Sequence, residues 1–199
     1  MAFIKTITPE EAEGKLAQLY RRVSGPQGQV DKVLQVHSLR PHSMEGHMAL
    51  YKAVLHHSGN KLAVWFLESI GVLVSRLNGC EYCEQHHSSG MRNLLADQAT
   101  KFARCLEQLC TDSPGDPFTA AESAALRYAR KLTQTPGDIC QSDIDQLRAA
   151  GLSDGEILEI NQVASYFSYA NRTVSGLGVT TSGEVLGLSP GDENSWQHG

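Results

Sequence analysis

Residues 61–87, KLAVWFLESIGVLVSRLNGCEYCEQHH, hold the most apolar segment of the chain, followed by its only closely spaced cysteines. From position 61 to 77 the segment is long and apolar and has a single acidic residue, Glu68, which predicts a central buried helix. Asn78 and Gly79 interrupt that helix, and Cys80 stands where the next one begins. The stretch therefore predicts two successive helices joined by a short turn.

Cys80, Cys83 and His87 share one face of the second predicted helix, because residues three, four and seven apart lie on the same stripe. Unpaired backbone N–H groups and the helix dipole at a helix start stabilise a thiolate, which is the nucleophilic form of cysteine. His87 can accept a thiol proton or stabilise the thiolate as an imidazolium. Because two thiols at this spacing can also close a disulfide, the pattern predicts a redox-active dithiol.

Glu68 is the only charged residue between positions 62 and 74. Burial among apolar side chains raises the pKa of a carboxyl group, and a raised pKa suits proton transfer near neutral pH. Antiparallel packing of the two helices would bring Glu68 towards the thiols and the imidazole. The alternative is an exposed or ion-paired Glu68 on a polar edge with Ser75 and Arg76.

Metal binding is the main alternative to redox chemistry. Cys80, Cys83 and His87 can hold zinc, with Glu68 or His86 as a fourth ligand. Structural zinc sites usually include a second pair of ligands at matching spacing, and no other cysteines form such a pair. The spacing therefore favours a redox pair, and we expect neither a metal nor another cofactor.

The remaining residues with reactive or aromatic side chains are expected to have structural roles. Five histidines are expected at the surface or satisfied in the core: His37, His42, His47, His56 and His57. Three cysteines are expected to be buried spectators: Cys105, Cys110 and Cys140. Three aromatic residues near the motif are expected to pack in the core: Trp65, Phe66 and Tyr82.

The composition is that of a globular protein, with 199 residues, 41% hydrophobic and 20% charged. A net charge of -5 gives no electrostatic footprint for nucleic acid or an anionic membrane. The N-terminal residues do not resemble a signal peptide, and the longest apolar run is too short to span a bilayer. Five cysteines without such a leader favour a reducing compartment, so the expected location is the cytoplasm.

Apolar residues recur at helical spacing along the chain and none of its segments alternates like a strand, so the predicted fold class is all-α. The expected helices are 8–23, 30–39, 43–57, 61–77, 80–95, 97–110, 119–133, 142–150 and 153–175. Capping boxes open three of them, at Thr8, Thr119 and Ser153. We expect one compact helical domain over residues 1–180 and a loop-like C-terminal tail over 181–199.

The order Glu68, Cys80, Cys83 and His87 resembles the alkylhydroperoxidase D-like group of the carboxymuconolactone decarboxylase family. The similarity is greatest to its uncharacterised peroxidase-related branch, whose long final helix resembles residues 169–179, YANRTVSGLGV. The resemblance extends from about the first predicted helix to position 179. One departure is Tyr82, because alkylhydroperoxidase D has a histidine at that position.

The resemblance implies an all-helical fold, a homo-oligomer (dimer, trimer or hexamer) and a peroxidase-type cycle. By the family's pattern, Cys83 attacks the hydroperoxide and Cys80 resolves the sulfenic acid. His87 and Glu68 form the proton relay, and an external dithiol or protein thiol is the reductant. The alternative function is a metal-binding or redox-sensing helical module without turnover.

Overall fold

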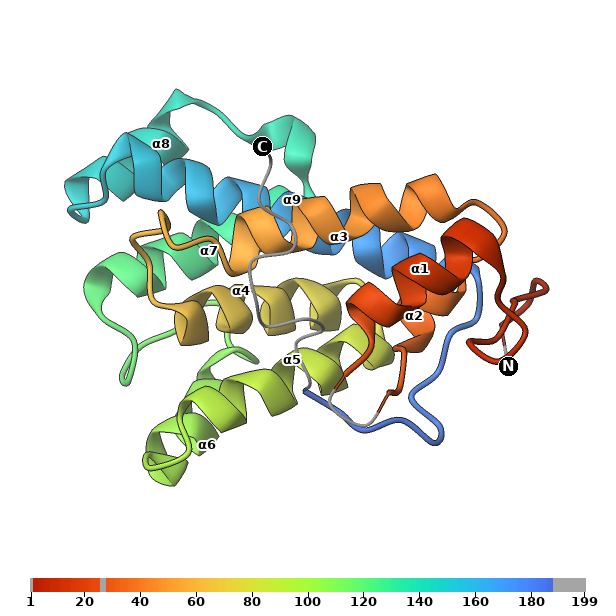
Figure 1. The fold of residues 1–199 in the computed structure, drawn as a ribbon. Coiled ribbons are helices and arrows are strands. Elements are labelled where there is room, and N and C mark those ends of the chain that lie inside the picture. The colour runs from red at the N-terminus through yellow and green to blue at the C-terminus, as the bar shows by residue number, and fades with distance from the viewer. Residues whose placement is uncertain (1, 26–27, 188–199) are drawn as a thin grey trace.

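The computed structural model describes residues 2–25 and 28–187, and over these ranges it contains helices and loops but no strand (Figure 1). The predicted all-α class is therefore confirmed. The helices are α1 (Gly14–Val23), α2 (Lys32–Gln35), α3 (Pro41–Leu55), α4 (Val64–Leu77), α5 (Glu81–Leu94), α6 (Ala99–Gln108), α7 (Ala120–Gln134), α8 (Gln141–Ala149) and α9 (Asp154–Gly176), with a 3-10 turn, η1 (Pro136–Asp138), before α8. In the described part of the chain no helix is long and apolar enough to cross a membrane.

Helix α4 is the centre of the fold and packs against α5, α7 and α9 (Figure 1). Every residue of α4 from Phe66 to Ser75 is buried, as predicted for the central helix. The crossing with α9 is close, because a Cβ added at Gly71 would lie 2.3 Å from the ring of Phe167. This contact fixes the distance between α4 and α9.

The turn between α4 and α5 lets the two helices pack side by side. Gly79 has a φ of 65°, a left-handed conformation that favours glycine. The N–H of Gly79 donates to the Arg76 carbonyl at 3.0 Å, and the N–H of Cys80 donates to the Ser75 carbonyl at 2.9 Å. These bonds satisfy the last carbonyls of α4 and place Cys80 immediately before α5, so the predicted helix start is confirmed.

Two of the three predicted capping boxes are present. At the start of α7 the Thr119 hydroxyl accepts from the N–H of Glu122 at 3.2 Å, and the Glu122 carboxylate accepts from the N–H of Thr119 at 2.8 Å. Ser153 and Glu156 form the same pair of bonds at the start of α9, at 3.3 and 2.8 Å. The side-chain pattern therefore located the beginnings of both helices.

The prediction for the first helix was wrong at its start. Thr8 to Glu11 forms an isolated turn, and α1 begins only at Gly14. Gly14 has a φ of +54°, which interrupts helical geometry between the turn and α1. The next predicted helix, 30–39, is also shorter than expected, because only residues 32–35 are α-helical and turns follow them.

Two of the predicted buried thiols are exposed. Cys105 is buried inside α6, as expected. Cys110 and Cys140 lie outside the helices, just after α6 and just before α8, and are exposed. Helical spacing predicted their positions near helix ends but not their exposure.

After α9 the chain turns back and ends its described course beside α5 (Figure 1). We call residues 180–187 the C-terminal strap. The Thr181 hydroxyl donates to the side chain of Gln85 at 2.7 Å, and the Ser89 hydroxyl donates to the Leu186 carbonyl at 3.4 Å. The strap contains no helix and is packed against α5; the rest of the expected tail, 188–199, lies outside the described residues.

Candidate active site

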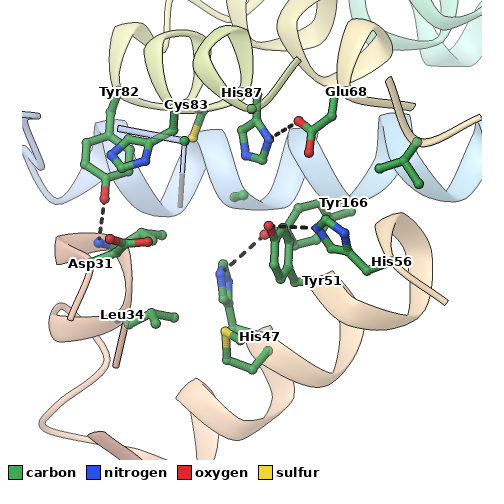
Figure 2. Close-up of a pocket in the computed structure, with 18 of the residues that line it drawn as sticks. Asp31, Leu34, His47, Tyr51, His56, Glu68, Tyr82, Cys83, His87 and Tyr166 are labelled. Carbon is green, nitrogen blue, oxygen red and sulfur yellow. Dashed lines mark hydrogen bonds and ion pairs between the residues drawn. The ribbon is translucent and has the colours of Figure 1, made fainter. Parts of the chain in front are cut away.

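A cavity of about 670 Å³ lies between α3, α4, α5 and α9 (Figure 2). Sites of this size hold a whole small organic molecule. The side chains of Cys83, His87 and Glu68 lie along one side of the cavity, and those of Tyr51, Tyr166 and His47 face them from the other side (Figure 2). Three of the four predicted site residues therefore meet on one wall.

Glu68 and His87 form a short hydrogen bond, with 2.6 Å between Oε2 of Glu68 and Nδ1 of His87. Both side chains are largely buried, and the His87 ring also packs edge-on against Phe167 at 4.5 Å between centroids. Gly90, one turn beyond His87, also adjoins the carboxylate, since a Cβ there would lie 3.6 Å from it, in ordinary van der Waals contact. The expected approach of Glu68 to the imidazole is confirmed, and the exposed alternative for Glu68 is wrong.

This pairing gives the imidazole a fixed orientation. A carboxylate bonded to Nδ1 orients the ring and fixes its tautomer, as carboxylates do in acid–base catalytic sites. The other ring nitrogen, Nε2, remains for proton exchange on the cavity side. The pair can therefore store and deliver a proton next to Cys83.

The two cysteines differ in access to the cavity. Cys83 lies in the first turn of α5 and lines the cavity, whereas Cys80 lies just before α5 and does not line it. Cys80 packs in a small apolar cluster with Val36, Val174 and Val179. Both thiols are less than 5% exposed, so a molecule reaches the pair through the cavity at Cys83.

The two thiols also differ in acidity. The Cys83 thiol donates a hydrogen bond to Cys80, and this bond is the main reason why the pKa of Cys80 is lowered to about 6. Hydrogen bonds from the Cys83 backbone N–H, Ser175 and Asn171 lower the pKa of Cys80 further. The same interaction raises the pKa of Cys83 well above its usual value, and burial raises it further. The expected lowering at the helix start therefore applies to Cys80 and not to Cys83. The pair binds one proton, which Cys83 holds on the cavity side.

The opposite wall contains residues that we expected to be structural. On α3, Tyr51 donates or accepts a hydrogen bond with Nε2 of His56 at 2.9 Å. His47 and Tyr166 are joined by a bond of 3.3 Å between Nε2 and the hydroxyl. Both His47 and His56 line the cavity. Nδ1 of the buried His47 has no hydrogen-bond partner among the described residues, so the expectation of a satisfied core histidine is wrong for His47, whereas His56 is hydrogen-bonded as expected. The sequence showed that His47 and Tyr51 share one face of α3, but it did not show that this face packs against α9.

Tyr82 and His86 also line the cavity, so the expectation that Tyr82 packs only in the core is wrong. The Tyr82 hydroxyl accepts from the N–H of Val33 at 3.2 Å and donates to Glu184 of the C-terminal strap at 3.3 Å. Nε2 of His86 lies 3.6 Å from the same carboxylate. Tyr82 therefore anchors the C-terminal strap. Trp65 and Phe66 pack against Phe118, as expected.

Within residues 2–25 and 28–187, no group of three or more histidine, cysteine or acidic side chains is arranged to hold a metal ion. Of the residues expected as zinc ligands, His87 is bonded through Nδ1 to Glu68.

Solved structures show that the chain has the alkylhydroperoxidase D-like fold. An uncharacterised peroxidase-related protein from Ralstonia eutropha JMP134, an alkylhydroperoxidase AhpD core, is 20% identical with a TM-score of 0.76. The match covers 90% of this chain and 91% of that protein. An uncharacterised peroxidase-related protein from Silicibacter sp. TM1040 is 23% identical with a TM-score of 0.72, over 89% and 87% of the two chains. The fold predicted from the motif is thus confirmed.

A protein of different activity has the same fold. A cysteine-to-alanine variant of the debrominase Bmp8, in complex with 2,3,4-tribromopyrrole, is 16% identical with a TM-score of 0.66, over 90% of this chain and 93% of that protein. No protein-family model and no curated protein matches the chain. The fold by itself therefore does not identify an activity, and the function has to be argued from the site.

Proposed function

We propose that the protein is a thiol-dependent reductase of organic hydroperoxides. The observation that carries the proposal is the cavity wall on which Cys83 lies beside the hydrogen-bonded His87 and Glu68. Cys80 touches Cys83 from outside the cavity. A hydroperoxide in the cavity therefore meets Cys83 first, with a proton donor beside it and a second thiol behind it.

In the first step, the Cys83 sulfur attacks the terminal peroxide oxygen, and the O–O bond breaks. The leaving alkoxide takes the proton held by His87, so that the products are an alcohol and a sulfenic acid on Cys83. In the second step, the Cys80 sulfur attacks that sulfenic acid, which releases water and closes a disulfide. An external dithiol or protein thiol then reduces the disulfide and is itself oxidised, which restores both thiols.

The acidity of the pair bears on the first step. In the resting protein the negative charge lies mainly on Cys80, and Cys83 holds the shared proton. Transfer of that proton to Cys80 or to His87 converts Cys83 to the attacking thiolate. Cys80 therefore acts first as a base for Cys83 and afterwards as the resolving thiol, which explains why a buried dithiol can react near neutral pH.

The experiment uses the reduced full-length protein and one equivalent of cumene hydroperoxide, followed by alkylation and mass spectrometry of the peptide that spans residues 77–92. Wild-type protein is expected to lose two hydrogens from this peptide. Cys80→Ser is expected to retain a sulfenic acid on Cys83, trapped by dimedone, after a single oxidation. Cys83→Ser is expected to consume no hydroperoxide, and Cys105→Ser is the matched control with an intact pair. Equal peroxide consumption by Cys83→Ser and wild type would defeat the mechanism.

Reductive debromination is the second candidate, and the aromatic walls of the cavity favour it as a site for a flat ring. In this reaction two thiols reduce a carbon–bromine bond to a carbon–hydrogen bond and become a disulfide, with release of hydrogen bromide. Bromide release from a bromopyrrole, without reaction towards cumene hydroperoxide, would replace the first candidate with the second. Thiols that react with neither compound would favour the redox-sensing or metal-binding alternative. The family resemblance also supports a cytoplasmic homo-oligomer. Light scattering of the purified protein measures its mass and so tests for the oligomer.

A further inference from the structure

Two groups on the wall across the cavity from Cys83 carry no charge, those of His47 and Tyr166. His47 is 4% exposed, and burial together with nearby His37 and His87 lowers the pKa of His47 to about 3, so its imidazole is neutral. Tyr166 is also 4% exposed, and burial raises its pKa well above the usual value, so it keeps its phenolic proton. The pair can therefore exchange hydrogen bonds with a ligand but cannot neutralise a charge.

The hydrogen bonding of His47 indicates whether His47 or Tyr166 has a hydrogen-bond donor available for a ligand. Nε2 of His47 is bonded to the Tyr166 hydroxyl, and Nδ1 has no hydrogen-bond partner in the described part of the chain. A buried N–H without a partner is rarer than a buried acceptor without one, so the ring proton belongs on Nε2. His47 then donates to the Tyr166 oxygen, and the Tyr166 O–H is left to donate to another group.

The cavity offers the Tyr166 proton to whatever occupies it. Tyr166 lines the cavity, and the only hydrogen bond that its hydroxyl makes to another described residue is the bond to His47 (Figure 2). A donor that already accepts a hydrogen bond is polarised and donates more strongly. The Tyr166 hydroxyl is therefore placed to hold an oxygen acceptor of a bound ligand.

The remaining lining restricts the charge of such a ligand. None of the described residues that line the cavity is a lysine or an arginine, whereas Asp31 and Glu68 both line it. A carboxylate or phosphate in the cavity would be desolvated beside these two acids, and the imidazole beside Cys83, that of His87, is already paired with Glu68. The volume of about 670 Å³ is also far larger than hydrogen peroxide needs.

We propose that the cavity selects bulky, uncharged organic hydroperoxides that carry a second oxygen atom, and that the Tyr166 hydroxyl, held by His47, donates a hydrogen bond to that oxygen. The inference rests on the proposed hydroperoxide reduction and names its substrate class. Tyr166 thereby fixes the distal end of the substrate while the peroxide end lies at Cys83. Anionic hydroperoxides, such as those of free fatty acids, are excluded because the described lining has no lysine or arginine and contains the acids Asp31 and Glu68.

The test measures binding and needs no turnover. The ligands are 2-phenyl-2-propanol, the alcohol that cumene hydroperoxide leaves, and its derivatives with a para-acetyl, para-isopropyl or para-carboxylate group. Dissociation constants are measured with the reduced wild-type protein, with Tyr166→Phe and with Tyr128→Phe. Tyr128 is a matched control, because its buried hydroxyl bonds to Asn161 at 2.9 Å and does not line the cavity.

The ratio of acetyl to isopropyl affinity is expected to fall about tenfold in Tyr166→Phe, which corresponds to ~1.4 kcal/mol, and to stay unchanged in Tyr128→Phe. The carboxylate is expected to bind at least about tenfold more weakly than the acetyl compound. An unchanged ratio in Tyr166→Phe, or carboxylate binding as tight as acetyl binding, would overturn the inference.

A spectroscopic measurement on wild-type protein keeps the inference testable if Tyr166→Phe does not fold. The infrared carbonyl stretch of the bound acetyl compound is expected at the lower frequency of a hydrogen-bonded ketone. The frequency of a free ketone would overturn the inference. Because neither measurement requires Cys83 to react, a failure of hydroperoxide reduction and a failure of ligand selection give separate results.

Discussion

The acidity of Cys80 depends on a hydrogen bond from its partner thiol, and two substitutions of Cys83 separate this effect from the loss of the thiol itself. Cys83→Ser keeps a hydroxyl that can donate to the Cys80 thiolate, whereas Cys83→Ala removes the donor. Both variants keep the backbone N–H of the first turn, which also lowers the pKa of Cys80. We expect the pKa of Cys80 to stay near 6 in the serine variant and to rise in the alanine variant.

The size of the rise follows from the groups around Cys80. Four groups lower its pKa from 9.0 to about 6 against the opposing effect of burial, and the Cys83 thiol is the largest of them. The largest of four contributions supplies more than a quarter of the net lowering of about 3, so its removal raises the pKa by at least about 0.8. At pH 5 the thiolate fraction then falls about sixfold, equivalent to ~1 kcal/mol.

The assay is the thiolate absorbance at 240 nm between pH 4 and 9, in a background with the exposed Cys110 and Cys140 replaced by serine. Cys105 does not interfere, because burial raises its pKa to about 11. The reduced dithiol is expected to show one thiolate with a midpoint near pH 6. A wild-type midpoint near 9, or identical titrations of the serine and alanine variants, would refute the reasoning.

Three further predictions concern the proton relay, the packing of the core and the buried acid Asp31 that lines the cavity. Glu68→Gln is expected to lower kcat/KM for an organic hydroperoxide by about 10²-fold or more, because an amide can donate to Nδ1 of His87 and so favour the wrong imidazole tautomer. Gly71→Ala is expected to destabilise the protein by about 1–3 kcal/mol in urea unfolding, because the new Cβ would overlap the Phe167 ring, whereas Gly46→Ala meets no atom within 4 Å and is expected to be harmless. Burial raises the pKa of Asp31 from 3.8 to about 6, so the folded state loses up to ~3 kcal/mol of stability as pH rises from about 4 to 6, and Asp31→Asn is expected to remove that loss.

Each of these predictions has an outcome that contradicts it. For the relay, Glu159→Gln is the matched control, because Glu159 accepts from the backbone N–H groups of Lys61 and Leu62 away from the cavity. Equal activity of the two glutamine variants would remove Glu68 from the relay. Equal stability of the Gly71 and Gly46 variants would mean that α4 and α9 separate without loss. An unchanged pH dependence in Asp31→Asn would assign it to another group.

Much of the helical framework and the Glu68–His87 pair could be predicted from the sequence. The apolar run before Cys80 predicted the central helix, and the capping boxes at Thr119 and Ser153 located two helix starts. The prediction failed at Thr8, where a capping pattern of the same kind forms only a turn. A local pattern does not show whether the following residues continue the helix. Here Gly14 has a positive φ, which separates the turn at Thr8 from α1.

The opposite wall of the site could not be predicted in the same way. His47 and Tyr166 are 119 residues apart, and their hydrogen bond exists only because α3 and α9 pack together. Likewise, Glu184 reaches Tyr82 and His86 only because the C-terminal strap returns to α5. Spacing along one helix cannot identify a residue whose role depends on a second helix.

By itself, the sequence determined what depends on neighbours along the chain: the all-α class, the break at Asn78 and Gly79, and the common face of Cys83 and His87 on α5. These features follow from helical periodicity and the conformational freedom of glycine. Only the tertiary structure decided which thiol faces the cavity, which one is acidic, and which uncharged groups oppose them. Burial and contacts between distant helices set access and pKa values, because both depend on how much water and which dipoles surround a group.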